Sequence, residues 1–169
     1  MAIDINKVPE FYQNYFKPVG SSELVPLLLQ SGDHLMELLK SINDEKALHR
    51  YEEGKWSIKD LVQHIIDSER VFVYRAMRFA RNDKTELSGF DQDHYVPEAN
   101  ADHRTVHQLL TEFMNLRAAT IDFSSSLNQE YRERTGTSNG VEMSVEMIGY
   151  IISGHLLHHI KIIEERYLK

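Results

Sequence analysis

Residues 147–167, MIGYIISGHLLHHIKIIEERY, give the clearest indication of the fold, because their apolar side chains recur at spacings of three and four. On a helical wheel this spacing gathers one apolar face, which consists of Met147, Ile148, Ile151, Ile152, Ile162 and Ile163. His155 and His159 fall near the middle of that face, and His158 lies just to one side of it. The stretch therefore predicts a long helix that carries imidazoles on its buried side.

The same spacing recurs in earlier parts of the chain, and no stretch alternates convincingly as a strand. We expect four helices, over residues 22–41, 57–81, 102–127 and 144–169. Ser22 is the expected N-cap of the first helix, and Ser57 with Asp60 forms a capping-box-like pair at the start of the second. The pattern predicts an all-α fold, a four-helix bundle that forms one domain over residues 1–169.

Three connecting segments complete the expected architecture. Residues 82–101 form a long polar loop, which we expect to cross over between the second and third helices. Residues 128–143 contain Gly136, Asn139 and Gly140 and are typical of a turn-rich linker. The N-terminal arm is expected to pack on the bundle because it contains several aromatic residues, namely Phe11, Tyr12, Tyr15 and Phe16.

Composition excludes several classes of protein. The net charge of −7 argues against a protein that binds duplex nucleic acid. The absence of cysteine excludes disulfides, thiolate metal sites and a sulfur nucleophile belonging to the protein. No run approaches the roughly 20 apolar residues of a membrane helix. We expect a cytoplasmic protein, because its first residues also lack a signal-peptide pattern.

Two histidine pairs with the spacing HxxxH occur in the chain. His155 and His159 lie on an otherwise apolar face and can point at one object, for which a divalent metal is the favoured interpretation. His103 and His107 have the same spacing, but they lie beside charged residues at a helix start, where solvated side chains are favoured. His158 is expected either to pack in the bundle or to contact the metal-binding histidines without binding the metal itself.

A metal site needs a further ligand, and the second predicted helix offers His64 on the flank of its apolar face. From spacing alone, His64 is either a satisfied, partly buried residue or a ligand. His34, on the flank of the first predicted helix, is a weaker competitor.

Three segments resemble the DinB-like superfamily of small helical-bundle metalloproteins, which includes YfiT-like proteins and low-molecular-weight thiol S-transferases. The segments are YEEGKWSIKDLVQHIIDSERVFVYRAMRFARND (51–83), SGFDQDHYVP (88–97) and MIGYIISGHLLHHIKIIEERY (147–167). The family pattern is one histidine on the second helix and an HxxxH pair on the fourth. The resemblance therefore implies that His64, His155 and His159 together bind a divalent metal.

Two charges fall on faces that should be buried, Glu69 on the second helix and Arg117 on the third. The favoured interpretation is a structural ion pair, because an unpaired buried charge is costly. The alternative makes Glu69 a general base, although it points about 140° away from His64 on an ideal helix. Asp67 lies closer to the face of His64 and is a second catalytic candidate. In the crossover segment, Asp91, Asp93, His94 and Tyr95 form either a pocket rim or lid, or caps of helix ends.

Together these observations predict a metal-dependent enzyme. Three imidazoles suit zinc, nickel, iron or cobalt, and they leave open positions for water or substrate. The resemblance favours thiol S-transfer to a small-molecule substrate, with a low-molecular-weight thiol as cosubstrate and a homodimer as assembly. The alternatives are a metal-dependent hydrolase and a non-catalytic metal-binding module of the stress response. Neither nucleic acid nor membrane is an expected partner.

Overall fold

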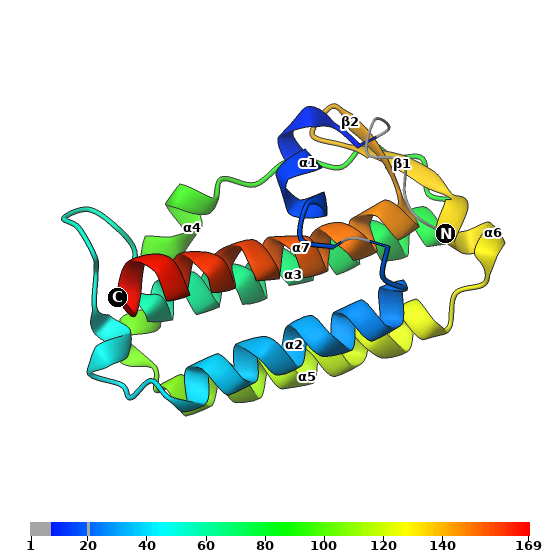
Figure 1. Ribbon diagram of the computed structural model, residues 1–169. Coiled ribbons are helices and arrows are strands. Elements are labelled where there is room, and N and C mark those ends of the chain that lie inside the picture. Colours follow the sequence, from blue (N-terminus) through cyan, green and yellow to red (C-terminus); the bar gives the residue numbers. More distant parts are fainter. Residues whose placement is uncertain (1–7, 20) are drawn as a thin grey trace.

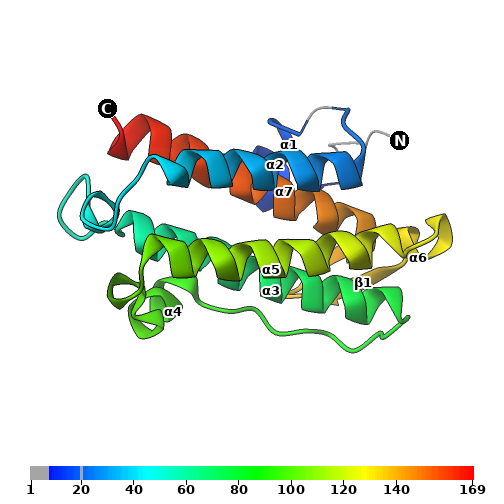
Figure 2. The same ribbon diagram turned by 90° about the horizontal axis from the view of Figure 1, so that it is seen from below.

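A computed structural model describes residues 8–19 and 21–169 of the chain. Its four long helices are α2 (Leu24–Lys40), α3 (Ile58–Ala80), α5 (Val106–Ser125) and α7 (Val145–Ile162). Helices α2 and α3 each pack against both α5 and α7, so the order around the bundle is α2, α7, α3, α5 (Figures 1 and 2). The predicted four-helix bundle is confirmed.

The direction of the helices explains the long crossover between α3 and α5. In Figure 1 these two neighbours run the same way along the bundle, whereas α2 and α7 run the opposite way. Parallel neighbours need a connection that returns along the full length of the bundle. The segment after α3 makes this return along the outside of α3, as Figure 2 shows.

The crossover is more structured than the sequence predicts. It contains the helix α4 (Gln92–Ala99) and the short 3₁₀ turn η3 (Ala101–His103). Before α4 the chain is tied to the opposite end of the bundle, because the Leu87 amide donates to the Thr137 carbonyl at 3.0 Å. The prediction of a long crossover is confirmed, but the expectation of a loop without helices is wrong.

The prediction of a simple linker over residues 128–143 is wrong. The segment forms α6 (Gln129–Glu133) and two antiparallel strands, β1 (Thr135–Ser138) and β2 (Val141–Ser144). The turn between the strands is Asn139–Gly140, with φ angles of 53° and 72°, a dipeptide typical of tight hairpins. Strands of four residues are too short to show alternation in the sequence.

The helix starts depart from the prediction by a few residues. Helix α3 begins directly after its N-cap Ser57, which forms the predicted capping box with Asp60. Helix α5 begins after Thr105, whose hydroxyl and the Gln108 side chain form a capping box, rather than near residue 102. The N-cap of α2 is Glu23 instead of Ser22, and no side chain caps its backbone. The remaining elements are α1 (Glu10–Phe16), the 3₁₀ turn η2 (Lys46–Leu48) and the π-helical turn η4 (Ile163–Tyr167).

The core consists of two apolar clusters separated by a polar layer. On each long helix the buried apolar residues pass from one cluster to the other near the middle, for example between Leu28 and Leu35 of α2. Buried polar residues occupy this middle region, namely Ser31, Ser68, Glu69, Arg117, Thr120, Ser153 and His155. Of the three predicted metal ligands, His155 lies in this middle layer, whereas His64 and His159 lie next to it among the residues of the second apolar cluster.

Candidate metal centre

His64 is placed by the first two turns of α3. The capping box at Ser57 fixes where the helix starts, and apolar side chains on both sides bury the turn that carries His64. The His64 ring lies 5.0 Å from the Trp56 ring, and the Ser68 hydroxyl lies 3.5 Å from its Nδ1. Only 4% of His64 is exposed. The histidine that spacing left ambiguous points into the protein.

The other two imidazoles come from adjacent turns of α7. His155 and His159 share one face because they are four residues apart. The Nε2 atom of His155 lies 3.0 Å from the Nε2 of His64 and 3.0 Å from the Nε2 of His159. Three nitrogens about 2.0–2.1 Å from a common centre would show separations of this size. The Nε2 atom of His155 carries either one proton or one lone pair, so it can form a hydrogen bond with only one of its two neighbours. Hydrogen bonding alone therefore does not satisfy the cluster.

Burial keeps these imidazoles neutral, which is the form that binds metal. It lowers the pKa of His64 from 6.5 to about 4. Burial, followed by the proximity of the other imidazoles, holds the pKa values of His155 and His159 well below 6.5. The His159 Nδ1 is buried and finds no hydrogen-bond partner among the residues that the structure describes. The donor set and the geometry are compatible with a divalent metal.

Helix α1 covers the cluster from outside the bundle, above α7 in Figure 1. The Tyr15 ring packs edge-on against His155 at 5.3 Å and against His158 at 5.5 Å. This close approach depends on Gly154, since a Cβ atom there would lie 1.8 Å from the Tyr15 carbonyl oxygen. The expected packing of the N-terminal arm is confirmed for α1, while residues 1–7 lie outside the described residues. His158 itself is half-buried and packs against His159.

Two cavities reach the imidazole cluster from different sides. One, of about 110 Å³, lies beneath α1 and is lined by His155, Ser68, Phe72 and Arg75 among others. The other, of about 280 Å³, is lined by His159, Trp56, Tyr167 and Asp93 among others. The cluster is therefore a buried centre with access on two sides.

The crossover residues divide between the two roles that were predicted for them. The Asp91 carboxylate caps α4 by accepting from the amides of Asp93 and His94. Asp93 lies on the rim of the cavity at His159, whereas Tyr95 packs against Phe90. One of these four residues thus lines a cavity, and another caps a helix.

Neither predicted catalytic carboxylate joins the imidazoles. Asp67 accepts from the Gln63 amide at 3.0 Å and from Arg70 at 3.2 Å, and it is not among the residues whose donor atoms converge with the imidazoles. Glu69 forms the predicted ion pair with Arg117, with a shortest nitrogen–oxygen distance of 2.7 Å. Of the two interpretations of Glu69, the structural ion pair is the one that the structure bears out.

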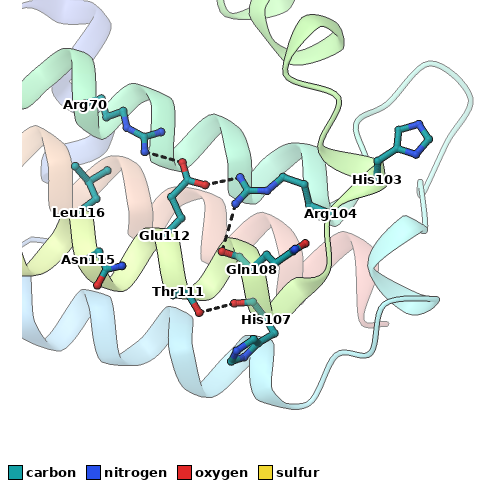
Figure 3. A pocket seen from close by; sticks show the side chains of 9 residues that line it. All are labelled: Arg70, His103, Arg104, His107, Gln108, Thr111, Glu112, Asn115 and Leu116. Atoms are coloured by element: carbon teal, nitrogen blue, oxygen red, sulfur yellow. Dashed lines mark hydrogen bonds and ion pairs between the residues drawn. The ribbon is translucent and has the colours of Figure 1, made fainter.

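The remaining predicted histidines lie away from the centre. His34 is exposed, and its Nε2 lies 3.3 Å from a carboxylate oxygen of Glu164. His103 and His107 are exposed and border a broad groove of about 960 Å³ on α5 (Figure 3). Both arginines in this groove are paired with carboxylates, because Glu112 contacts Arg70 and Arg104 and Arg70 also contacts Asp67. The expectation that the second HxxxH pair is solvated is confirmed.

Sequence reasoning missed the residues that enclose the cluster. Trp56, Tyr15 and Ser68 contact the imidazoles, and Gly154 allows α1 to pack closely on α7 because it has no side chain. Two of these had a visible signal, because Trp56 comes just before the capping box and Gly154 directly precedes His155. The wall formed by α1 had no signal, since nothing in the sequence states which helix the arm covers.

The chain matches known proteins over most of its length. A protein of Oceanobacillus iheyensis named "Putative metal-dependent hydrolase OB0413" is 29% identical over 132 residues, which is 75% of each chain. The solved structure of YfiT from Bacillus subtilis, described as "a probable metal-dependent hydrolase with an unusual four-helix bundle topology", superposes with a TM-score of 0.76. This superposition covers 90% of this chain and 95% of YfiT at 16% identity, so it shows a shared fold.

Two further comparisons bear on the class of protein. None of the helices in the described ranges 8–19 and 21–169 has the length and apolar character that crossing a membrane requires. The sequence pattern of the DinB superfamily matches residues 27–163, a range that holds all three clustered histidines and both helices that carry them. The chain belongs to the DinB superfamily.

Proposed function

We propose that His64, His155 and His159 hold one divalent transition-metal ion and that the protein is a metal-dependent hydrolase of small molecules. The observation that carries the proposal is the convergence of three buried Nε2 atoms, two pairs of which are 3.0 Å apart. The name of the Oceanobacillus iheyensis relative supports the same reaction class.

The donor set restricts which ion the chain would hold. Three neutral imidazoles favour zinc, nickel, iron or cobalt over calcium or magnesium, which prefer oxygen ligands. Three protein ligands leave at least one coordination position open, as in catalytic rather than closed structural sites. When bound, such an ion would supply Lewis-acid chemistry, lowering the pKa of a water or thiol in the open position.

The protein's own residues have three roles in this proposal. The three imidazoles hold the ion, and the Ser68 hydroxyl orients His64 through its Nδ1. Tyr15 and Trp56 pack against His155 and His64, and each lines one of the two cavities through which a substrate would approach. Asp93, on the rim of the cavity at His159, is the carboxylate that lies where a proton acceptor could act on an incoming group.

Thiol transfer is a second candidate, and one specific observation favours it. The two cavities meet the imidazole cluster at His155 and at His159, which would let a thiol and an acceptor approach from separate sides. Because the chain contains no cysteine, the sulfur would have to arrive with a cosubstrate.

A screen of the metal-loaded protein separates these functions. Ester and amide substrates are tested without thiol, and electrophilic acceptors are tested with a low-molecular-weight thiol. We expect turnover without thiol, lost in His159→Ala and retained in His103→Ala, which alters an exposed histidine outside the cluster. Activity only with thiol would replace hydrolysis by transfer. A loaded protein with neither activity would favour the non-catalytic module.

A further inference from the structure

Arg75 is a buried cation with no acidic partner in the part of the chain that the structure describes. Only 4% of it is exposed, and its Nη2 donates to the Ser88 carbonyl at 3.1 Å. Its Cζ lies 5.9 Å from the centre of the Phe72 ring, and the Tyr12 hydroxyl lies beside the guanidinium. Burial lowers the pKa of Arg75, and the nearby Tyr12 offsets only part of this effect.

Arg117 differs from Arg75 because its buried guanidinium group is fully paired. Arg117 is equally buried, but its guanidinium donates to both carboxylate oxygens of Glu69, to the Leu28 carbonyl and to the Ser31 hydroxyl. A buried guanidinium is tolerated when an anion faces it with good geometry. Arg75 lacks such an anion within the described chain, and it lines a cavity instead.

That cavity connects Arg75 with the imidazole cluster. On α3, His64, Ser68, Phe72 and Arg75 lie at steps of four, four and three residues, so they share one face of the helix. The last three line the cavity of about 110 Å³ together with His155. Phe72 bridges the two ends, because its ring lies 6.1 Å from the His155 ring. One small molecule could therefore reach Arg75 and the centre at the same time.

We propose that Arg75 binds a carboxylate group of the substrate, which places the reacting bond of that substrate at the imidazole cluster. The inference rests on the proposed function in taking the cluster as the reaction centre. A planar carboxylate matches the guanidinium fork in two parallel hydrogen bonds. Tyr12, Tyr15 and Phe90 add aromatic walls that suit a short hydrocarbon chain carrying the anion. The proposed substrate is a small molecule with a free carboxylate at one end and, several bonds away, the bond that reacts.

The test measures binding to the metal-free protein at pH 8, where the imidazoles are neutral and neither a metal ion nor a histidine cation attracts anions. Butyrate is titrated against butyramide, which has nearly the same shape without the charge, and binding is followed at the arginine Nε–Hε resonances. We expect butyrate to bind at least tenfold more tightly than butyramide and to shift the Arg75 resonance. Arg75→Met should remove this preference, while Arg81→Met, an exposed arginine at the end of the same helix, should keep it.

Each other result overturns the assignment. Equal binding of butyrate and butyramide, a shift confined to other arginines, or a folded Arg75→Met that keeps the preference would each contradict it. Tenfold tighter binding of inorganic phosphate than of butyrate would replace the carboxylate by a phosphoryl group. If Arg75→Met does not fold, Arg75→Lys and the resonance of the unmodified protein decide. Because this binding is measured without metal, it does not depend on the activity screen. Carboxylate binding at Arg75 together with a metal-loaded protein that hydrolyses no ester or amide would refute the proposed function and leave the anion-binding role of Arg75 standing.

Discussion

Glu69 and Arg117 form the most complete interaction among the buried polar side chains. Glu69 also accepts from the Thr120 hydroxyl at 2.7 Å, and Arg117 also reaches the backbone of α2. The pair thereby joins α3, α5 and α2 at the middle of the bundle. It was predictable from the sequence, because two opposite charges on apolar faces of neighbouring helices have few other uses.

Replacing Arg117 by Leu should destabilise the protein by about 3–5 kcal/mol, because the change leaves Glu69 buried without its counter-ion. Urea unfolding followed by circular dichroism measures the loss. The double variant Glu69→Met with Arg117→Leu should recover much of it, since neither position then holds a buried charge without its counter-ion. A single-variant loss below about 1 kcal/mol, typical of exposed pairs, would show that the pair is not buried in solution.

The lowered histidine pKa values predict that the metal-free protein loses stability in mild acid. The unfolded chain takes up protons near pH 6.5, whereas His64 in the folded protein does so only near pH 4. Between these values the unfolded state binds more protons, so the free energy of unfolding falls as the pH falls. Each such group contributes about 1.4 kcal/mol per pH unit across the window.

Urea unfolding of chelator-treated protein at several pH values between 7 and 4 measures this slope. His64→Phe should reduce it, and His34→Phe, at an exposed position, should not. A free energy of unfolding that is constant from pH 6.5 to 4.5 would contradict the neutral, buried state of the cluster.

At the scale of the element, the contact between α1 and α7 decides how the centre is enclosed. Gly154 permits the contact, and the arm then lays Tyr15 on His155. The sequence predicted that the aromatic arm packs on the bundle, because exposed aromatic residues are unfavourable. It could not predict where, since that depends on the shape of the α3–α7 surface.

Gly154→Ala should destabilise the protein although alanine is the better helix former by about 1 kcal/mol. The added Cβ would lie 1.8 Å from the Tyr15 carbonyl oxygen, so α1 must move away from α7. Hydrogen exchange of the α1 amides should become faster, and thermal melting should shift to lower temperature. The matched control is Ser153→Ala, one residue earlier, which removes a buried hydroxyl that has no partner in the described chain.

Ser153→Ala should leave α1 in place and leave stability unchanged or slightly raised. If Gly154→Ala keeps slow exchange in α1 and melts like the control, the close packing of α1 on α7 is refuted.

The long helices were predictable and the short elements were not, for a physical reason. Four helices of 17 to 23 residues repeat their apolar spacing often enough to be recognised. Strands β1 and β2 have only four residues each. They are held in place by long-range contacts, because Gly136 packs on Phe79 and the Leu87 backbone hydrogen-bonds to Thr137 and Asn139. Such long-range contacts leave no local pattern in the sequence.

At the scale of the whole molecule, the arrangement of the helices creates the centre. Helices α3 and α7 lie side by side and run in opposite directions, which brings the second turn of α3 opposite the later turns of α7. The spacing of His155 and His159 predicted two of the three convergent imidazoles. His64 needed the family resemblance, because spacing within one helix cannot say which residue of another helix lies opposite.

The two cavities could not be predicted at all, since they lie between elements distant in the sequence. The cavity at His159 is bordered by α3, α4 and α7, and the cavity at His155 by α1, α3 and α7. These cavities would give a substrate access to the centre, and the cavity at His155 is also lined by Arg75.

The metal content of the protein reports directly on whether the three imidazoles bind an ion. Protein stripped with chelator, loaded with zinc, nickel, iron or cobalt and dialysed is analysed for bound metal per chain. We predict about one ion per chain for the unmodified protein and for His103→Ala with His107→Ala, and little or none for His64→Ala, His155→Ala or His159→Ala. Folding of each variant is checked by circular dichroism. An unmodified protein that retains no ion, or folded variants of the cluster that retain one ion per chain, would contradict the account.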